Sequence, residues 1–181
     1  MDRKLVMYGK ERVDEVLERV LFIDPGLGGT GWAFFPWVRS NATKKTLTPP
    51  EITGVLTAPT NEKWDNRAWS YCAQFAGIIN SCEPETVVFE YPELFSGSAK
   101  SQASAARGDL FKLTFLIGGL AQVAREVTGK LPILVTPLEW KGQLPKPVVI
   151  DRIKKRWPEF TSIDDHEGDA IGMGLSAQGR L

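Results

Sequence analysis

The strongest constraint on the fold lies in residues 21–35, LFIDPGLGGTGWAFF, where a short apolar run ends at one acid and a glycine-rich stretch. Residues 20–23 are typical of a buried strand, because a brief apolar run bounded by glycine and proline suits one. The glycines between 26 and 31 indicate a tight turn, and residues 32–35 then resume strand character. This segment predicts a β-hairpin with Asp24 at the end of its first strand.

Further apolar runs and turn residues divide the remaining chain into alternating elements. We expect a helix from Glu11, strands at 52–56, 86–90 and 131–136, and helices at 62–81, 103–128, 147–157 and 164–177. The apolar stripe expected for the helix at 62–81 comprises Trp69, Cys72, Phe75, Ala76 and Ile79. Three strands in succession, followed by helix–strand alternation, indicate an α/β fold with a mixed five-stranded sheet and helices on both faces.

The chain length and the absence of long apolar runs restrict the class of protein. A chain of 181 residues suits one domain with a substantial core, and we assign residues 1–19 to an N-terminal extension of it. No run approaches the roughly 18 apolar residues that a membrane helix needs, and the N-terminus lacks the apolar core of a signal peptide. We therefore expect a cytoplasmic protein without membrane contact. Cys72 and Cys82 have no disulfide or zinc spacing and are expected to be reduced.

Charge is balanced overall but segregated along the chain. The 22 basic and 22 acidic residues give a net charge of zero, which by itself argues against strong nucleic-acid binding. Residues 91–157 nevertheless hold 11 Lys or Arg and 5 Asp or Glu, a local charge of +6, and the flanking residues carry −6. A basic surface beside an acidic site is therefore compatible with the composition.

Acidic residues end two predicted strands and begin the last helix. Asp24 and Glu90 lie side by side if their strands are neighbours in the sheet. In the third group, DDHEGDAIGMGL, His166 and Asp169 are three residues apart and share a helix face, as do Asp165 and Asp169, four apart. A glycine disfavours a helix by about 1 kcal/mol relative to alanine, so the three glycines of this group indicate close packing against the sheet. Oxygen ligands of this kind hold Mg²⁺ or Mn²⁺, and two such ions support phosphodiester hydrolysis.

Each of these residues also has a simpler interpretation. Asp24 alone could hydrogen-bond the turn, Glu90 could be a solvated strand end, and His166 could be a satisfied surface residue. Asp164 and Asp165 could be favourable charges at a helix N-terminus. The joint pattern, with acids at two strand ends and one helix face, favours a metal site over these separate interpretations.

Five motifs together resemble the RuvC family of Holliday junction resolvases, which has the RNase H-like fold. They are IDPGLGGTGWA, VVFEYPELF, SQASAARGDLF, TPLEWKGQLPKPVVIDRI and DHEGDAIGMGL, in this order over residues 20–175. The resemblance implies that Asp24, Glu90, His166 and Asp169 are catalytic and bind metal, with Asp165 as an alternative to His166. It also implies two Mg²⁺ or Mn²⁺ ions per site, a homodimer, and symmetric nicking of four-way DNA junctions, with the glycine turn keeping bulk away from the scissile phosphate.

Some residues depart from the family pattern. A family phenylalanine that wedges into the junction lies three residues after the strand acid, where this chain has Glu93. Phe95 is our preferred replacement and Tyr91 the second choice. The long N-terminus and the zero net charge suggest a divergent, phage-encoded member. The cations that we expect on DNA phosphates are Lys100, Arg107, Lys112, Lys141 and Lys146.

Other functions are compatible with parts of this pattern. The same nuclease site could act on flaps, Y-junctions or other branched DNA. The motif DPGLGGTGWA also resembles phosphate loops of actin-like proteins and sugar kinases, but such phosphotransferases need two domains of this kind, for which 181 residues leave no room. A non-catalytic junction-binding module would not need the whole set of acids and histidine.

Gly118 and Gly119 make the helix at 103–128 the candidate dimer interface, and packing on its own sheet is the alternative.

Overall fold

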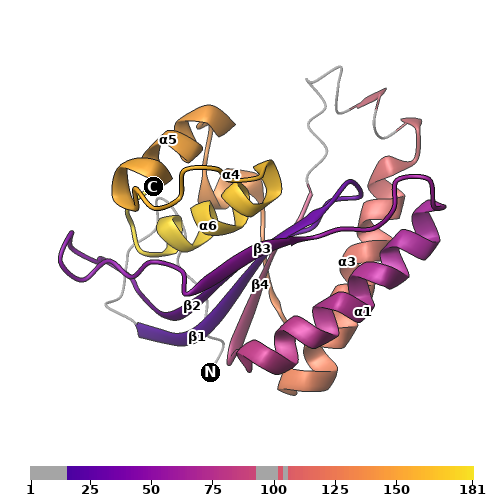
Figure 1. Cartoon of the computed structure of the whole chain (residues 1–181), viewed down its shortest axis with the longest axis horizontal. Coiled ribbons are helices and arrows are strands. Elements are labelled where there is room, and N and C mark those ends of the chain that lie inside the picture. The colour runs from indigo at the N-terminus through magenta and orange to yellow at the C-terminus, as the bar shows by residue number, and fades with distance from the viewer. Residues whose placement is uncertain (1–15, 93–101, 104–105) are drawn as a thin grey trace.

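A computed structural model describes residues 16–92, 102–103 and 106–181, which form one central sheet covered by helices (Figure 1). The strand order is β3-β2-β1-β4-β5. Strands β1 (Val16–Asp24), β2 (Thr30–Arg39) and β3 (Ile52–Leu56) are joined by antiparallel pairing. Strand β4 (Thr86–Glu90) pairs parallel with β1, and β5 (Ile133–Val135) pairs parallel with β4. The predicted mixed five-stranded sheet is confirmed.

Helices cover both faces of this sheet, as predicted. Helices α1 (Trp64–Cys82) and α3 (Asp109–Thr128) lie together on one face (Figure 1). The other face carries α4 (Pro137–Trp140), α5 (Lys146–Arg156) and α6 (Asp165–Ala177). No helix within the described ranges is long and apolar enough to cross a membrane.

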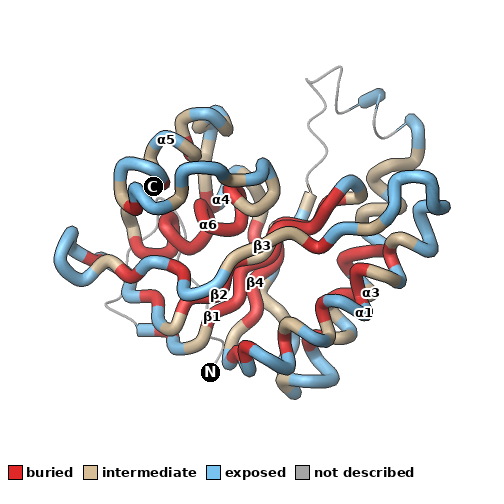
Figure 2. The backbone as a smooth tube through the Cα atoms, in the orientation of Figure 1, coloured by how far each residue is buried: buried red, intermediate tan, exposed pale blue. Residues whose placement is uncertain are grey.

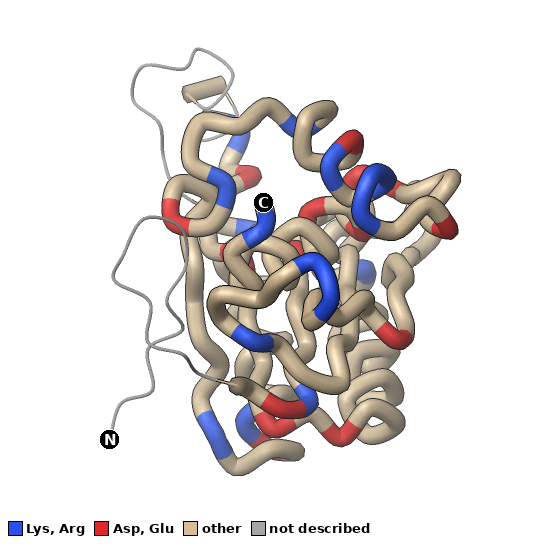
Figure 3. The backbone as a smooth tube through the Cα atoms, turned by 90° about the vertical axis from the view of Figure 1, so that its left-hand side faces the viewer, with Lys and Arg blue, Asp and Glu red and all other residues tan. Residues whose placement is uncertain are grey.

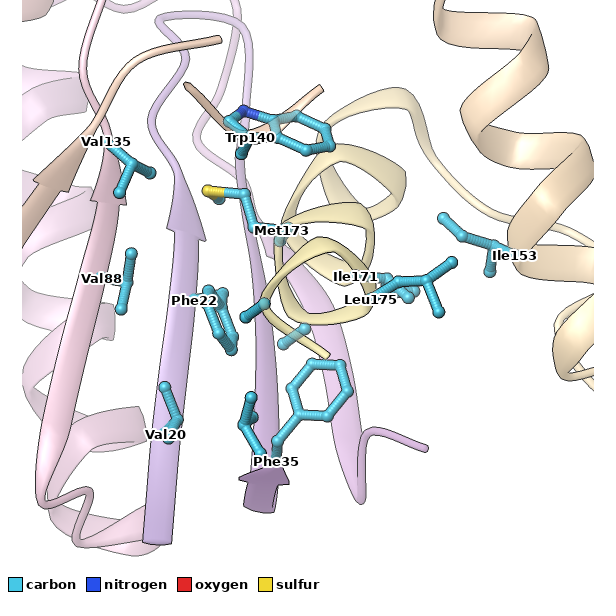
Figure 4. Close-up of a cluster of buried hydrophobic side chains, with 14 of the residues drawn as sticks. Val20, Phe22, Phe35, Val88, Val135, Trp140, Ile153, Ile171, Met173 and Leu175 are labelled. Atoms are coloured by element: carbon cyan, nitrogen blue, oxygen red, sulfur yellow. The ribbon is translucent and has the colours of Figure 1, made fainter. Parts of the chain in front are cut away.

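Two hydrophobic cores separate the layers, because successive strand side chains point to opposite faces. Leu21 and Ile23 of β1 pack towards α1 and α3, whereas Val20 and Phe22 pack towards α6. The buried positions follow the strands and the inner sides of the helices (Figure 2). Figure 4 shows the α6 core, in which Phe22 and Phe35 meet edge to face at a centroid distance of 5.5 Å. Cys72 and Cys82 are free and buried, as expected.

The start of the sheet differs from the prediction. Residues 1–15 lie outside the described part of the chain, so the beginning of the helix predicted from Glu11 is not described. From Val16 onwards the prediction is wrong, because β1 begins there and pairs with Arg39 at the far end of β2. Residues 16–19 of the proposed extension therefore belong to the sheet. Val16, Leu17 and Val20 recur at the spacing of a helix, but pairing with β2 overrides this pattern. Leu17 and Val20 are both buried in the core between the sheet and α6.

Three other elements differ from their predicted form. Residues 102–103 and 106 are helical, but the helix predicted from residue 103 is interrupted at 107–108, and α3 starts at Asp109 after Gly108 with a left-handed φ of 74°. Trp69, predicted to lie in the apolar stripe of α1, is 63% exposed, and Ala68 and Tyr71 are buried instead. The short helix α4 was not predicted, although its capping box of Thr136 and Glu139 is visible in the sequence.

Candidate active site

The sheet places Asp24 and Glu90 side by side. Strands β1 and β4 are parallel neighbours, and Ile23 pairs with Phe89, so the acid that follows each of them reaches the same edge. Asp24 is 5% exposed, and the side chain of Glu90 is 15% exposed. The arrangement predicted for these two strand ends is confirmed.

Glycine allows the start of α6 to approach this edge. A Cβ atom on Gly31 would lie 2.1 Å from the carbonyl group of His166, so only glycine lets the helix backbone rest on β2. Asp164 caps α6 and forms a capping box with Glu167, whose other oxygen accepts a hydrogen bond from Thr53 Oγ1 on β3 at 2.5 Å. The helix N-terminus is thereby attached to β2 and β3, and His166 and Asp169 face the strand ends.

His166 contacts Asp24 directly. Its Nδ1 lies 2.7 Å from Asp24 Oδ2, and this hydrogen bond raises the pKa of the imidazole above its ordinary value. The ring fills the turn after Asp24, since a Cβ on Gly26 would lie 2.4 Å from His166 Cε1. The glycines of this turn therefore make room for the imidazole, a role that the sequence did not reveal.

Two lysines neutralise the third acid. Lys141 and Lys146 place their Nζ atoms 3.3 and 3.2 Å from the same oxygen, Asp169 Oδ2. Lys141 also lies 3.9 Å from Glu90 Oε2, and Lys146 lies 3.7 Å from Asp165 Oδ2. Asp165 is thus at the rim, with a side chain that is 79% exposed, whereas Asp169 is buried.

Trp140 is a site residue that the sequence analysis missed. Its Nε1–H donates to Glu90 Oε2 at 2.7 Å, although the side chain is fully buried in the α6 core. The available signal was its position next to Lys141 in the motif TPLEWKG, but a lone tryptophan in an apolar setting reads equally well as a core residue.

Burial raises the pKa values of the two acids at the strand ends, Asp24 and Glu90. It raises the pKa of Glu90 to about 7, with the neighbouring Asp24 adding to the effect and Lys141 opposing it. Burial also raises the pKa of Asp24 from its ordinary value, while the hydrogen bond with His166 lowers it. Two acids with raised pKa values at one sheet edge are typical of a functional site.

The donor set fits a divalent cation. Three carboxylates and one imidazole converge here, and Asp169 Oδ1 is buried without a hydrogen-bond partner. An unpaired buried carboxylate oxygen is costly unless a cation binds it. Among the described residues, no three Asp, Glu, His or Cys side chains are already arranged around one point as metal ligands. One oxygen of each of the three carboxylates is instead held by Trp140, His166 or the two lysines.

The cations expected on DNA fall into two groups. Lys141 and Lys146 lie in the acid cluster, while Arg107 and Lys112 both pair with Asp109 at the start of α3. Tyr91 is exposed and follows β4, where its backbone N–H donates to Val135. Phe95 and Lys100 lie outside the described residues. On the side of the molecule that carries α5, charges of both signs are interspersed (Figure 3).

Comparisons with known proteins identify the fold. No protein-family model and no curated protein sequence matches the chain. A solved structure of Thermus thermophilus RuvC in complex with a Holliday junction substrate is similar, with a TM-score of 0.65 and 18% identity over 90% of this chain and 92% of that one. Another Thermus thermophilus RuvC structure gives 0.64 and 19% over the same shares. The chain therefore has the RNase H-like fold predicted from its motifs.

Proposed function

We propose that this protein is a metal-dependent, structure-specific endonuclease that resolves Holliday junctions by paired symmetric nicks. The observation that carries the proposal is the convergence of Asp24, Glu90, His166 and Asp169 at one sheet edge, with Asp169 Oδ1 buried and unpaired. The likeness in fold to RuvC, one structure of which holds a Holliday junction substrate, supports the same substrate class.

The four residues are proposed to hold two Mg²⁺ or Mn²⁺ ions through carboxylate oxygens and the imidazole, with Asp165 at the rim as the alternative to His166. When bound, two such ions would activate water and stabilise the charge that develops in phosphodiester hydrolysis. Glu90 and Asp24 bind metal only as carboxylates, and burial disfavours this charged form in both. Lys141 and Lys146 place two ammonium groups beside the site, where they can hold the DNA backbone.

Paired nicking requires two sites related by a two-fold axis, so we propose a homodimer. The solvent-facing side of α1 and α3 is the proposed contact, because it exposes Phe111 (79%), Trp69 (63%) and Phe115 (47%). Phe115 contacts Trp69 edge to face at 6.0 Å. No charged residue occurs between Lys112 and Arg125 of α3. Exposed apolar patches of this kind mark interaction sites.

DNA contacts outside the site are proposed for Arg107 and Lys112 at the start of α3, with Lys100 as a third cation. Cations at these positions would neutralise phosphates and give salt-sensitive binding without reading sequence. Phe95 remains the first choice and Tyr91 the second for the side chain that stacks at an opened crossover, where stacking contributes about 1–3 kcal/mol per base.

The glycine turn argues against a phosphotransferase. A phosphate-binding loop needs open backbone N–H groups, whereas here the imidazole of His166 fills the space beside Gly26. The structure thus supports a nuclease, and the range of branched DNA substrates is the point to test.

The decisive experiment compares DNA substrates in parallel. Labelled four-way junctions, Y-junctions, flaps and linear duplex are incubated with Mg²⁺, with Mn²⁺ and with excess chelator, and a sample with ATP and sugar tests phosphotransfer. We expect symmetric nicks in the four-way junction, none with chelator, and cleavage in Mn²⁺ at least as fast as in Mg²⁺, because imidazole suits Mn²⁺ better. Full activity in chelator would refute the mechanism, and preference for flaps would redirect the substrate assignment.

A further inference from the structure

Each of the three clustered carboxylates is held through one oxygen by a donor from another element. His166 holds Asp24 Oδ2, the two lysines hold Asp169 Oδ2, and Trp140 holds Glu90 Oε2. Among the described residues, no hydrogen bond reaches Glu90 Oε1. This division leaves one oxygen of each acid available for another ligand.

Trp140 differs from the other donors because it is immobilised by the core. It is fully buried at the end of α4, whose N-terminus is closed by the capping box of Thr136 and Glu139. Its carbonyl oxygen accepts a hydrogen bond from Ser176 Oγ at 2.6 Å, and a Cβ on Gly172 would lie 2.8 Å from the indole ring. Figure 4 shows the indole between the end of β5 and α6. The donor therefore cannot follow Glu90 if that carboxylate rotates.

The same indole also positions a lysine. Lys141 Nζ lies 4.7 Å from the centroid of the Trp140 ring, within the range of a cation–π interaction. That ammonium group contacts Asp169 Oδ2 at 3.3 Å and Glu90 Oε2 at 3.9 Å. One side chain thus orients the acid through its N–H and the cation through its ring face.

The geometry points to Trp140 as a positioning residue of the proposed nuclease, which fixes Oε2 of Glu90 and presents Oε1 to a divalent ion. The inference rests on the proposed function. A hydrogen bond to a carboxylate is about twice as strong as one between neutral groups, and a buried indole N–H without a partner is costly. The pair Trp140–Glu90 therefore has one strongly favoured arrangement, and the ligand geometry is set before metal or DNA arrives.

The test removes the N–H group and keeps an aromatic, although smaller, side chain. Trp140→Phe is compared with Trp157→Phe, a matched control because Trp157 lies in the same core, 6% exposed, and contacts Phe35 and Phe160 instead of an acid. Mn²⁺ affinity is measured by electron paramagnetic resonance in the absence of DNA, and junction cleavage is measured at saturating DNA. Loss of a partner that orients a metal ligand typically weakens metal affinity about 10- to 100-fold. We expect this loss, with a lower kcat and an unchanged KM for the junction, in Trp140→Phe only.

Two further measurements separate positioning from packing. Replacing Trp140 by 3-benzothienylalanine, in which sulfur takes the place of the N–H group, keeps the volume and should reproduce the loss even if Trp140→Phe unfolds. In a Glu90→Gln background, Trp140→Phe should leave Mn²⁺ affinity unchanged, because the oriented ligand is already gone. If the benzothienyl variant binds Mn²⁺ like the unmodified protein, the inference is wrong while the proposed nuclease stands. If the unmodified protein neither binds Mn²⁺ nor cleaves a junction, the proposed function fails and takes the inference with it.

Discussion

On one face of the sheet α6 is buried along almost its whole length (Figure 2). On the other face α1 and α3 expose the aromatic side chains of Trp69, Phe111 and Phe115. The glycines of the two faces differ in the same way. A Cβ on Gly174 of α6 would lie 2.3 Å from the ring of Phe35, so that glycine is required by packing within the chain. A Cβ on Gly118 of α3 would meet nothing within 4 Å.

The comparison teaches what an unexplained glycine indicates. Each helical glycine costs about 1 kcal/mol relative to alanine. On the α6 face this cost is offset by an approach that brings His166 and Asp169 to the strand ends. Gly119 of α3 has a similar reason, since its Cβ would lie 2.9 Å from Cys72 Sγ. Gly118 has none among the described residues, which fits an approach from a second copy.

Asp24→Asn should have the largest effect of all, and it acts on the α6 face alone. It removes a proposed metal ligand at constant volume, so junction cleavage should be abolished while junction binding persists. Because burial disfavours the carboxylate of Asp24, thermal stability should be unchanged or higher. Nicking assays, gel-shift binding and thermal melts check the three parts.

The control for this change is Asp165→Asn at the exposed rim, which should retain most of the cleavage. Near-normal nicking by Asp24→Asn would sink the metal-site assignment. Loss of cleavage in Asp165→Asn would move the fourth ligand from His166 to Asp165.

Gly174→Ala tests the tight packing of the α6 layer, and it should lower the stability of the chain. The added methyl group would overlap Phe35, and overpacking of a tight core typically costs about 1–3 kcal/mol. Urea unfolding should show this loss in the free energy of unfolding. An unchanged midpoint of urea unfolding would mean that α6 can shift away from the sheet to accommodate the methyl group. The short distance between α6 and β2 would then not be required by packing.

The pH dependence should reveal the buried acid on the α6 side. With a pKa of about 7 in the folded protein against an ordinary 4.5, Glu90 holds a proton between these values that the unfolded chain has lost. The free energy of unfolding in the absence of metal should therefore fall as pH rises through this window, and Mn²⁺ affinity should rise towards and above pH 7. Glu90→Gln should weaken both trends, and the remainder should come from Asp24 and His166, whose pKa values are also raised. A Mn²⁺ affinity that is flat between about pH 6 and pH 8 would contradict the raised pKa.

Gly118→Ala should have the smallest effect on the stability of the chain and the clearest effect on assembly. Since a Cβ on Gly118 would meet no described residue within 4 Å, alanine should stabilise the helix by up to about 1 kcal/mol. The same methyl group should weaken the proposed dimer, and light scattering should show more species near the 20.1 kDa of one chain. A dimer of unchanged affinity would place the interface elsewhere, and a wild-type protein that is monomeric at micromolar concentration would count against paired nicking.

Local pattern was sufficient for most of the secondary structure and for the identity of the acids. The glycine-rich hairpin, the strand acids Asp24 and Glu90, and the capped helix that carries His166 and Asp169 are all readable from spacing and turn chemistry. These features depend on residues close together in the chain, so periodicity reports them directly.

Tertiary structure decided everything that depends on distant partners. Val16 and Leu17 have helical spacing but form a strand because β2 is long enough to pair with them. Asp24 contacts an imidazole from 142 residues away, and Trp140 donates to an acid 50 residues away. Neither contact leaves a signal in the local sequence, because the two partners are brought together only when the chain folds. The sequence by itself determined which acids and which histidine are candidates for the site, and only the packed sheet and α6 decided which oxygen of each acid is held and which is left for the proposed metal.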